Sequence, residues 1–293
     1  MALFLTQLMN GIGSGVVYAS LGLAIVLIFR TTGVLNFAQG EMALFATYIT
    51  WELTQSPLPV WLAILISMGI AFIAGVLIER VIVRPVEKAS PLVLVIVTIG
   101  MFLAFNALAQ LFFGVDAKAL PRAYPDHSWI IGGVVLRSDT FVLVGVLAIE
   151  CLALWLLLQR TKLGLALRAV ASNPDSARLL GISAATMLML GWGLASALGA
   201  LAGALVVPTT TGLTAGSMQS VLIFSFAGVA LGGFDSPLGA VVGGLIIGVA
   251  GALTQQYLPA LSGIEIIVPF GLILLVLMFR PQGLFGQSKV ERV

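Results

Sequence analysis

The sequence predicts an all-α fold: a polytopic bundle of transmembrane helices that occupies residues 1–293 as a single domain. Three observations lead to this prediction: a high apolar content, a scarcity of charge, and apolar runs long enough to cross a membrane. Hydrophobic residues make up 60% of the 293 residues and charged residues only 9%. Globular proteins contain roughly 45–50% apolar residues, with Gly counted, and roughly 25% charged residues. The chain is therefore expected to lie in a lipid bilayer.

The apolar runs predict eight to nine membrane crossings. A helix rises 1.5 Å per residue, so about 20 residues cross a hydrocarbon core of roughly 30 Å. Each run should be helical, because backbone amides cannot stay unpaired in lipid. Two of the runs, 40–53 and 219–231, are short or interrupted by charge and would suit half-helices or re-entrant segments. The runs are Asn10–Phe29, Gly40–Leu53, Val60–Ile78, Pro91–Phe113, Thr140–Leu158, Ala185–Val207, Gln219–Leu231, Leu238–Leu258 and Ile266–Phe279.

The first apolar run is expected to be a retained membrane helix and not a cleavable signal. Residues Met1–Leu8 contain no Lys or Arg, and the first basic residue, Arg30, follows the run. A secretory signal would begin with a basic region.

The basic residues predict the orientation of the chain. If all nine runs cross and the C-terminus is cytoplasmic, only Lys118, Arg122 and Arg137 of the fourteen Lys and Arg residues lie outside. Cytoplasmic loops of membrane proteins carry an excess of Lys and Arg. The loop Gly114–Asp139 should then face outward, and the loop Arg160–Ala184 should lie in the cytoplasm.

Several kinds of chemistry have no sequence support. No Lys follows a Gly, so the Walker A pattern is missing and the chain has no ATPase site of its own. A single histidine, His127, and a single cysteine, Cys151, exclude a conventional His/Cys metal site. The net charge of +2 gives no indication of nucleic-acid binding. We therefore expect no enzyme and no cofactor in this chain, and transport or conduction is the leading class of function.

Small residues recur at four-residue spacing in several of the runs. Small residues let helix backbones approach closely in lipid, where van der Waals packing is the main attraction between helices. The pattern predicts ordinary packing inside the bundle, with contact to a partner subunit or a moving interface as the alternative. The positions are Gly11/Gly15, Gly191/Ala195/Gly199/Gly203, Gly228/Gly232, Gly239/Gly243 and Gly244/Gly248.

Four polar residues are candidates for a translocation path. Asn36, Gln39 and Glu41 follow the first run in a stretch that also contains two glycines. They fit either a broken helix that lines a cavity or a plain cytoplasmic turn with a carboxylate at a helix start. Glu150 lies in the middle of an apolar run, where a charge is costly. It fits either a path or subunit-interface role, or a locally hydrogen-bonded carboxyl group.

The cytoplasmic loop is expected to contain a short helix from about Pro174 to Leu180. Asn173 is a good N-cap and Pro174 suits the first helical position. Asp175 in the first turn and Arg178 near the end both complement the helix dipole, and Gly181 is a natural C-terminal stop.

This short helix should place Ala177 and Leu180 on one apolar side, three residues apart. A capped, partly apolar helix in a cytoplasmic loop suggests a docking surface for another protein. The alternative is a helix that lies on the membrane surface.

These residues resemble the permease subunits of bacterial branched-chain amino-acid ABC importers, of the LivH type. The resemblance covers nearly the whole chain. The motifs that carry it are Gly33-Val-Leu-Asn-Phe-Ala-Gln-Gly-Glu41, Glu79-Arg-Val-Ile-Val-Arg-Pro85, the loop Arg168–Ile182, and Gly228-Val-Ala-Leu-Gly-Gly-Phe-Asp-Ser-Pro-Leu-Gly239.

The resemblance implies that the loop Arg168–Ile182 couples the permease to a separate ATPase. It also implies two cytoplasmic ABC ATPase subunits that bind ATP and Mg, a second homologous permease that makes a heterodimer, an external or periplasmic substrate-binding protein, and a location in the bacterial inner membrane. The residues expected to contact the ATPase are Arg168, Asn173, Pro174, Asp175, Ala177, Arg178, Leu180 and Gly181.

No residue in the sequence selects the substrate. Within the resemblance, branched-chain or related hydrophobic amino acids are expected, with urea or short amides as the alternative. Outside it, a stand-alone secondary carrier or channel would work as a homo-oligomer without ATP, and an assembly subunit would have no path of its own.

Overall fold

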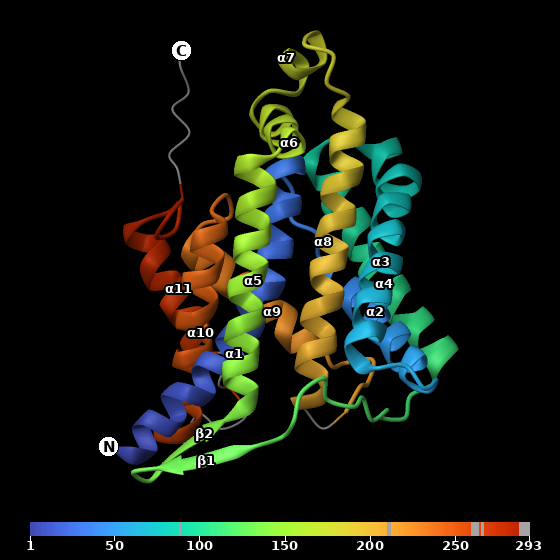
Figure 1. Ribbon diagram of the computed structural model, residues 1–293. Helices are drawn as coiled ribbons and strands as arrows, with labels where there is room; N and C mark the ends of the chain where they lie inside the picture. Colours follow the sequence, from blue (N-terminus) through green and yellow to red (C-terminus); the bar gives the residue numbers. More distant parts are fainter. Residues whose placement is uncertain (88, 210–211, 259–263, 265–266, 287–293) are drawn as a thin grey trace. The chain divides into compact units, whose positions relative to one another are not determined.

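The computed structural model describes residues 1–87, 89–209, 212–258, 264 and 267–286, and in these it is an all-α membrane bundle with one small β-hairpin (Figure 1). Among the described residues, six helices are long and apolar enough to cross a membrane. The helices are α1 (Ala2–Thr32), α2 (Gln39–Thr54), α3 (Val60–Ile78), α4 (Pro91–Phe113), α5 (Ser138–Arg160), α6 (Lys162–Ser172), α7 (Pro174–Leu179), α8 (Ala184–Val206), α9 (Gln219–Gly232), α10 (Pro237–Tyr257) and α11 (Ile267–Phe279).

The predicted membrane segments correspond to α1 to α5 and α8 to α11. Two of them, Val60–Ile78 and Pro91–Phe113, have the predicted bounds. The two doubtful runs form short helices of 16 and 14 residues, α2 and α9. At 1.5 Å per residue they are about 24 and 21 Å long, less than the roughly 30 Å of a hydrocarbon core. Residue 266, the expected start of the last run, lies outside the described residues.

The chain divides into two compact units. The first contains Met1–Val26, Tyr124–Leu147 and Ser220–Val293 as far as these are described, and the second contains Leu27–Ala123 and Ala148–Gln219. The sequence predicted a single domain and gave no sign of this division, because both units consist of segments that are far apart in the chain.

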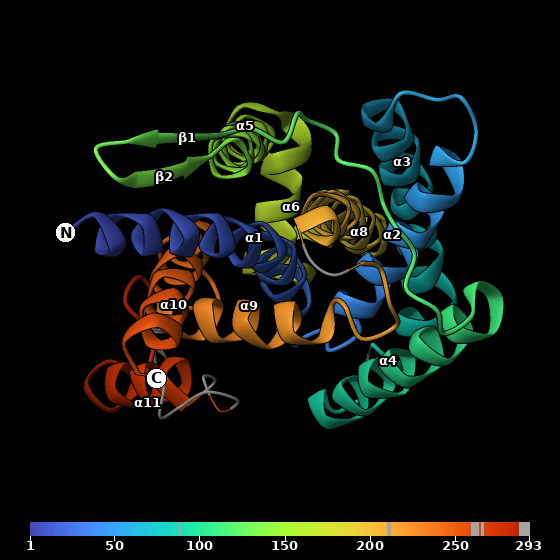
Figure 2. The same cartoon turned by 90° about the horizontal axis from the view of Figure 1, so that it is seen from below.

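Glycines hold the helices of the first unit together. A Cβ atom on Gly15 would lie 2.7 Å from the Cα atom of Leu245 in α10, and one on Gly248 would overlap the backbone of Gly15. A Cβ atom on Gly228 of α9 would lie 2.8 Å from the Cα atom of Gly244. The predicted close packing at four-residue spacing is thus present between α1, α9 and α10, which Figure 2 shows next to one another.

The first unit also contains the β-hairpin, which the sequence analysis missed. Strand β1 (Ser128–Ile131) pairs antiparallel with β2 (Val134–Arg137). The turn between them consists of Gly132 and Gly133, both with positive φ, at 59° and 80°. Two glycines between β-branched residues are a recognised hairpin signal, so the sequence did contain the information.

The second unit is built around α8. This helix packs against α3 and α2, and α4 in turn packs against α2. The contacts are close because glycines face neighbouring helices: a Cβ atom on Gly193 would lie 2.9 Å from the Phe72 ring, and one on Gly75 would lie 2.5 Å from the carbonyl oxygen of Trp192. Ser67 of α3 donates a hydrogen bond of 2.6 Å to the carbonyl oxygen of Ala46 in α2.

Helix α3 continues past Ile78 into a π-helical turn (Glu79–Val83) and a 3₁₀ turn (Arg84–Val86). With this extension the chain stays helical up to Val86. It carries Glu79 and Arg84 toward the end of α8 that lies nearest to α7 (Figure 1).

Candidate functional site

The candidate path residues at the start of α2 are buried. Helix α1 ends at Thr32, Gly33 has a positive φ of 71°, and the chain resumes helical structure at Gln39. The exposed fractions of Asn36, Gln39 and Glu41 are 1%, 0% and 1%. All three side chains are thus enclosed by the protein. Helix α2 begins inside the protein.

Amide side chains organise this helix start. The side-chain amide of Asn36 donates to Oε1 of Gln39 at 3.3 Å, and Oδ1 of Asn36 accepts a hydrogen bond from the backbone N–H of Ala38. Gln39 in turn donates to the carbonyl oxygen of Ala195 in α8 at 3.0 Å. Since buried polar groups need partners, these bonds fix both the loop and the position of α2 against α8.

Glu41 belongs to a second set of polar contacts, with α4. Asn106 donates to Oε2 of Glu41 at 3.1 Å and to the carbonyl oxygen of Ala215 at 2.8 Å, and Gln110 donates to Oδ1 of Asn106 at 2.7 Å. Glu41 is in the first turn of α2, where the helix dipole favours a carboxylate. The structure thus brings Asn36, Gln39 and Glu41 together at one helix start.

Asn106 and Gln110 were missed by the sequence analysis. Both lie in the uncharged run Pro91–Phe113, in which only their polarity sets them apart. Polar side chains inside a membrane helix usually bond to a neighbouring helix, and that signal was available.

Glu150 lies on a different helix. It is buried in α5, with 4% of its surface exposed, among the apolar residues that the sequence indicated. Glu150 belongs to the second unit. Its role as a path or interface residue remains a prediction.

The expected short helix is present as α7, with the expected caps. Asn173 accepts a hydrogen bond from the backbone N–H of Ser176 at 2.9 Å, and Pro174 occupies the first turn. Gly181 has a positive φ of 79° and its N–H donates to the carbonyl oxygen of Arg178. The N–H of Ile182 donates to the carbonyl oxygen of Ala177, and together the two bonds form a Schellman motif.

The expectation that Ala177 and Leu180 share one apolar side is wrong. Ala177 is 2% exposed and packs against Val170 of α6 and Ala184 of α8. Leu180 is 78% exposed and Leu179 89% exposed. The helix ends at Leu179, so Leu180 lies in the cap and departs from helical periodicity. One end of α7 is therefore fixed to the protein, and the two leucines project from it.

Helix α6, which precedes α7, was also missed. Thr161 caps it by accepting a hydrogen bond from the N–H of Gly164 at 3.0 Å. Any side chain at Gly164 would overlap the backbone of Leu157 and Leu158, so the glycine lets α6 fold back against the end of α5. Arg168 of α6 donates to Oε1 of Gln159 at 2.8 Å.

The charged residues of α7 form a surface pair. Arg178 donates to Oδ1 of Asp175 at 3.2 Å, and the two side chains are 53% and 89% exposed. Exposed pairs of this kind contribute roughly 0–1 kcal/mol, so both charges remain available to a partner.

An ion pair lies in the extension of α3, with a buried carboxylate and a partly exposed guanidinium group that also bonds to α8. Arg84 donates to Oε2 of Glu79 at 3.0 Å and to the carbonyl oxygen of Ala185 at 3.2 Å, while only 1% of the Glu79 side chain is exposed. Both residues lie in the motif Glu79–Pro85, yet their pairing across a π-helical turn was not predicted.

The described residues contain no group of three or more His, Cys, Asp or Glu side chains that could hold a metal ion. The site is therefore made of amide, carboxylate and guanidinium groups and of apolar helix surfaces.

The model of one protein family, described as "Branched-chain amino acid transport system / permease component", matches residues 7–277. The chain belongs to this family. It is 31% identical over 310 aligned residues to the high-affinity branched-chain amino acid transport system permease protein LivH of Salmonella typhimurium, covering 99% of this chain and 98% of that protein. It is also 31% identical to the permease protein BraD of Pseudomonas aeruginosa over the same shares of the two chains. A probable LivH of Methanocaldococcus jannaschii is 30% identical and covers 91% of this chain and 87% of that protein.

Membership in this permease family confirms the predicted class. The protein is a multi-pass membrane protein of the branched-chain amino acid permease family, and its relatives are transport subunits. The match extends from α1 into α11 and includes both the polar cluster at the start of α2 and the capped helix α7.

Proposed function

We propose that this permease is one subunit of an ATP-driven importer of branched-chain or related hydrophobic amino acids in the bacterial inner membrane. In this proposal, a second homologous permease completes the path, two cytoplasmic ABC ATPases bind ATP and Mg, and an external binding protein delivers the substrate. The names of the relatives support the substrate class.

The observation that carries the proposal is the arrangement of α7. Ala177 is buried against α6 and α8, whereas Leu179 and Leu180 are exposed next to the pair Asp175 and Arg178. Two adjacent leucines in water lose roughly 1.5–3 kcal/mol each relative to burial. A groove in a partner protein that buries the two leucines would remove this cost, and charged groups in the groove could pair with Asp175 and Arg178. A six-residue helix presents too short an apolar face for stable attachment to a membrane surface.

The basic residues support the cytoplasmic placement of α7. Arg160, Lys162, Arg168 and Arg178 all lie between α5 and α8, and such residues gather on the cytoplasmic side. The C-terminal residues 287–293, which the same argument puts in the cytoplasm, lie outside the described residues.

The proposed mechanism follows from the contacts of α7, which is held to the protein through Ala177 and exposes Leu179 and Leu180. When ATP closes the ATPase dimer, the movement passes through Leu179 and Leu180 to α7, and Ala177 transmits it to α6 and α8. Helix α8 packs on α2, so its displacement reaches the bond between Gln39 and the carbonyl oxygen of Ala195.

The polar cluster at the start of α2 is the proposed substrate contact in this chain. A zwitterionic amino acid needs partners for its two charged ends. Asn36, Gln39 and Glu41 offer amide and carboxylate groups that, in this structure, bond to one another and to α4 and α8. When α8 moves, these side chains exchange their internal hydrogen bonds for bonds to the substrate. Glu150 of α5 is a further candidate residue of the translocation path.

The test is co-purification and uptake. The permease is co-expressed with the ATPases, second permease and binding protein, and uptake of radiolabelled L-leucine is measured in proteoliposomes. The substitution Leu180→Asp should abolish uptake and the recovery of ATPase with the permease. The matched control Leu165→Asp changes a leucine of α6 that is 61% exposed and should retain both.

Three results would contradict the proposal. Normal uptake by the Leu180→Asp transporter would reject α7 as the contact with the ATPase. Uptake without ATP by the purified permease alone would instead show a stand-alone carrier, and uptake of urea in place of L-leucine would show a permease for short amides.

A further inference from the structure

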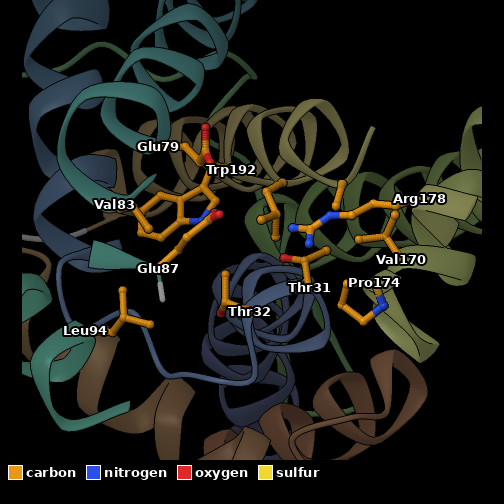
Figure 3. Close-up of a pocket in the computed structure, with 12 residues that line it drawn as sticks. Thr31, Thr32, Glu79, Val83, Glu87, Leu94, Val170, Pro174, Arg178 and Trp192 are labelled. Atoms are coloured by element: carbon orange, nitrogen blue, oxygen red, sulfur yellow. The ribbon is translucent and has the colours of Figure 1, made fainter. Parts of the chain in front are cut away.

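The second unit contains a cavity that neither the family relationship nor the proposed path explains. Its volume is about 250 Å³. It lies among the end of α1, the extension of α3, and the helices α4, α6, α7 and α8 (Figure 3). Pro174 and Arg178 of α7 are part of its wall, so the cavity adjoins the helix that we propose as the ATPase contact.

Two buried polar atoms in the cavity wall have no hydrogen-bond partner among the described residues. One is the donor Nε1–H of Trp192, whose residue is only 2% exposed, and the other is the acceptor Oε2 of Glu87. Buried polar groups without partners are rare in proteins, and each one calls for an explanation. A single molecule that carries both an acceptor and a donor would satisfy the two atoms together.

The charges around the cavity favour a ligand with both signs of charge. Glu79 is already neutralised by Arg84 at 3.0 Å, which leaves the carboxylate of Glu87 as the negative group without a described partner. Arg178 extends into the cavity from α7, on the side opposite Glu79 and Glu87 in Figure 3. Its pair with Asp175 is exposed and weak, so a ligand carboxylate can replace Asp175 at little cost.

The remaining wall is apolar and suits an aliphatic side chain. The cavity volume is several times the roughly 30 Å³ that one water takes up, so a single water does not fill it. Pockets for drug-sized molecules begin at roughly 300 Å³, so the cavity fits a molecule of the size of an amino acid. The apolar side chains are Val83, Leu94, Val170 and Leu188.

We propose that this cavity binds a free aliphatic α-amino acid from the cytoplasm. Its ammonium group pairs with Glu87, and its carboxylate accepts hydrogen bonds from Arg178 and from the indole N–H of Trp192. The site is separate from the polar cluster at the start of α2, which consists of other residues.

Occupation of the cavity would regulate the transporter. The ligand connects Arg178 of α7 to Glu87 beyond α3, so it stabilises the position that α7 has in this structure. A ligand shifts a conformational equilibrium only when it binds one state better, and this ligand would bind best while α7 stays in place. Accumulated product would then slow its own import. This regulatory part rests on the proposed function, whereas the binding part does not.

The binding test uses the full-length permease alone, in lipid nanodiscs, with radiolabelled L-leucine as the probe. We expect saturable binding that weakens about tenfold or more in Glu87→Gln, because the ammonium group loses a charged partner. The matched control Glu52→Gln changes an exposed glutamate outside the cavity and should bind like the wild type. Isoamylamine, which lacks the carboxylate, and 4-methylpentanoate, which lacks the ammonium group, should compete weakly.

A second variant keeps the inference testable if Glu87→Gln fails to fold. Leu188→Trp fills the cavity from α8 and should abolish binding while the protein elutes as a single species. The inference is overturned if wild-type protein binds no L-leucine, or if both variants bind it as the wild type does. The latter result would place L-leucine elsewhere in the chain.

The regulatory test uses the complete transporter in proteoliposomes, with L-leucine on the ATP side. Uptake should fall several-fold for the wild type and the Glu52→Gln control and stay constant for Glu87→Gln. Normal uptake with no such inhibition would overturn the regulation and leave the proposed import function intact. Absence of uptake, together with variant-sensitive binding, would reject the import function and support the cavity as a binding site.

Discussion

The side-chain amide of Gln39 donates a hydrogen bond to the carbonyl oxygen of Ala195, 156 residues further along the chain, at 3.0 Å. This bond joins the first residue of α2 to the middle of α8. Gly199 makes room for it, because a Cβ atom there would lie 2.8 Å from Nε2 of Gln39. A local polar motif thereby becomes a contact between two helices.

Gln39→Leu should destabilise the permease. The leucine has no amide to donate to the carbonyl oxygen of Ala195. It also has no oxygen to accept the hydrogen bond from the side-chain amide of Asn36. Loss of a buried hydrogen bond with a polar group left unpaired costs about 1–3 kcal/mol. Thermal unfolding in detergent should show a lower midpoint than that of the wild type. The control Gln55→Leu, at an exposed glutamine, should leave the midpoint unchanged. Equal midpoints for the two variants would contradict the importance of this bond.

Gly75→Ala should separate α3 from α8. The new Cβ atom would lie 2.5 Å from the backbone carbonyl oxygen of Trp192, which cannot move aside as a flexible side chain can. Overpacking of this kind costs about 1–3 kcal/mol. Gly69→Ala, on the same helix with open space around it, should be neutral or slightly stabilising. The measurement is the unfolding midpoint of each variant relative to the wild type. An unchanged midpoint for Gly75→Ala would mean that α3 and α8 can move apart without a loss of stability.

Gly248→Ala should have the same effect in the first unit. A Cβ atom at this position would overlap the backbone of Gly15 in α1, whereas one at Gly251 of the same helix would meet nothing within 4 Å. We expect reduced yield and a lower unfolding midpoint for Gly248→Ala and normal behaviour for Gly251→Ala. Similar losses for both would show that the effect comes from glycine replacement in α10 in general.

Asn173→Ala should weaken α7, the proposed contact with the ATPase, without affecting membrane insertion. It removes the acceptor for the N–H of Ser176, and loss of an N-cap costs typically about 1 kcal/mol. Uptake by the assembled transporter should fall, while Asn173→Asp keeps an acceptor and should retain most of it. If the alanine variant transports at the wild-type rate, α7 does not need its cap for coupling.

Arg84→Gln should be more harmful than the double variant Glu79→Gln/Arg84→Gln. The single change leaves the buried carboxylate of Glu79 without its partner, and a buried acceptor left unsatisfied costs about 1–3 kcal/mol. The double change removes both charges together. Unfolding midpoints of the three proteins test this order, and a double variant that is the least stable would contradict it.

The sequence predicted much of the membrane bundle because its signals are local. Long apolar runs require helices in lipid, so the bounds of α3 and α4 were predicted correctly from charge and hydropathy alone. Caps are local as well, so Asn173, Pro174 and Gly181 predicted both ends of α7 to within one residue. The Gly132–Gly133 hairpin and the helix α6 had local signals too, and these were overlooked.

Tertiary structure decided which side chains are buried and what they contact. Nothing local in the sequence shows that Ala177 faces α6 and α8 while Leu180 is exposed, because Leu180 lies just past the last helical residue. The partners of Glu41 and Gln39, which are Asn106 and Ala195, are 65 and 156 residues away. Such pairings depend on how helices pack, and short-range periodicity carries no record of them. The sequence by itself therefore determined that this chain forms capped and membrane-spanning helices, and only the packed structure decided which polar groups meet and where a cavity is left.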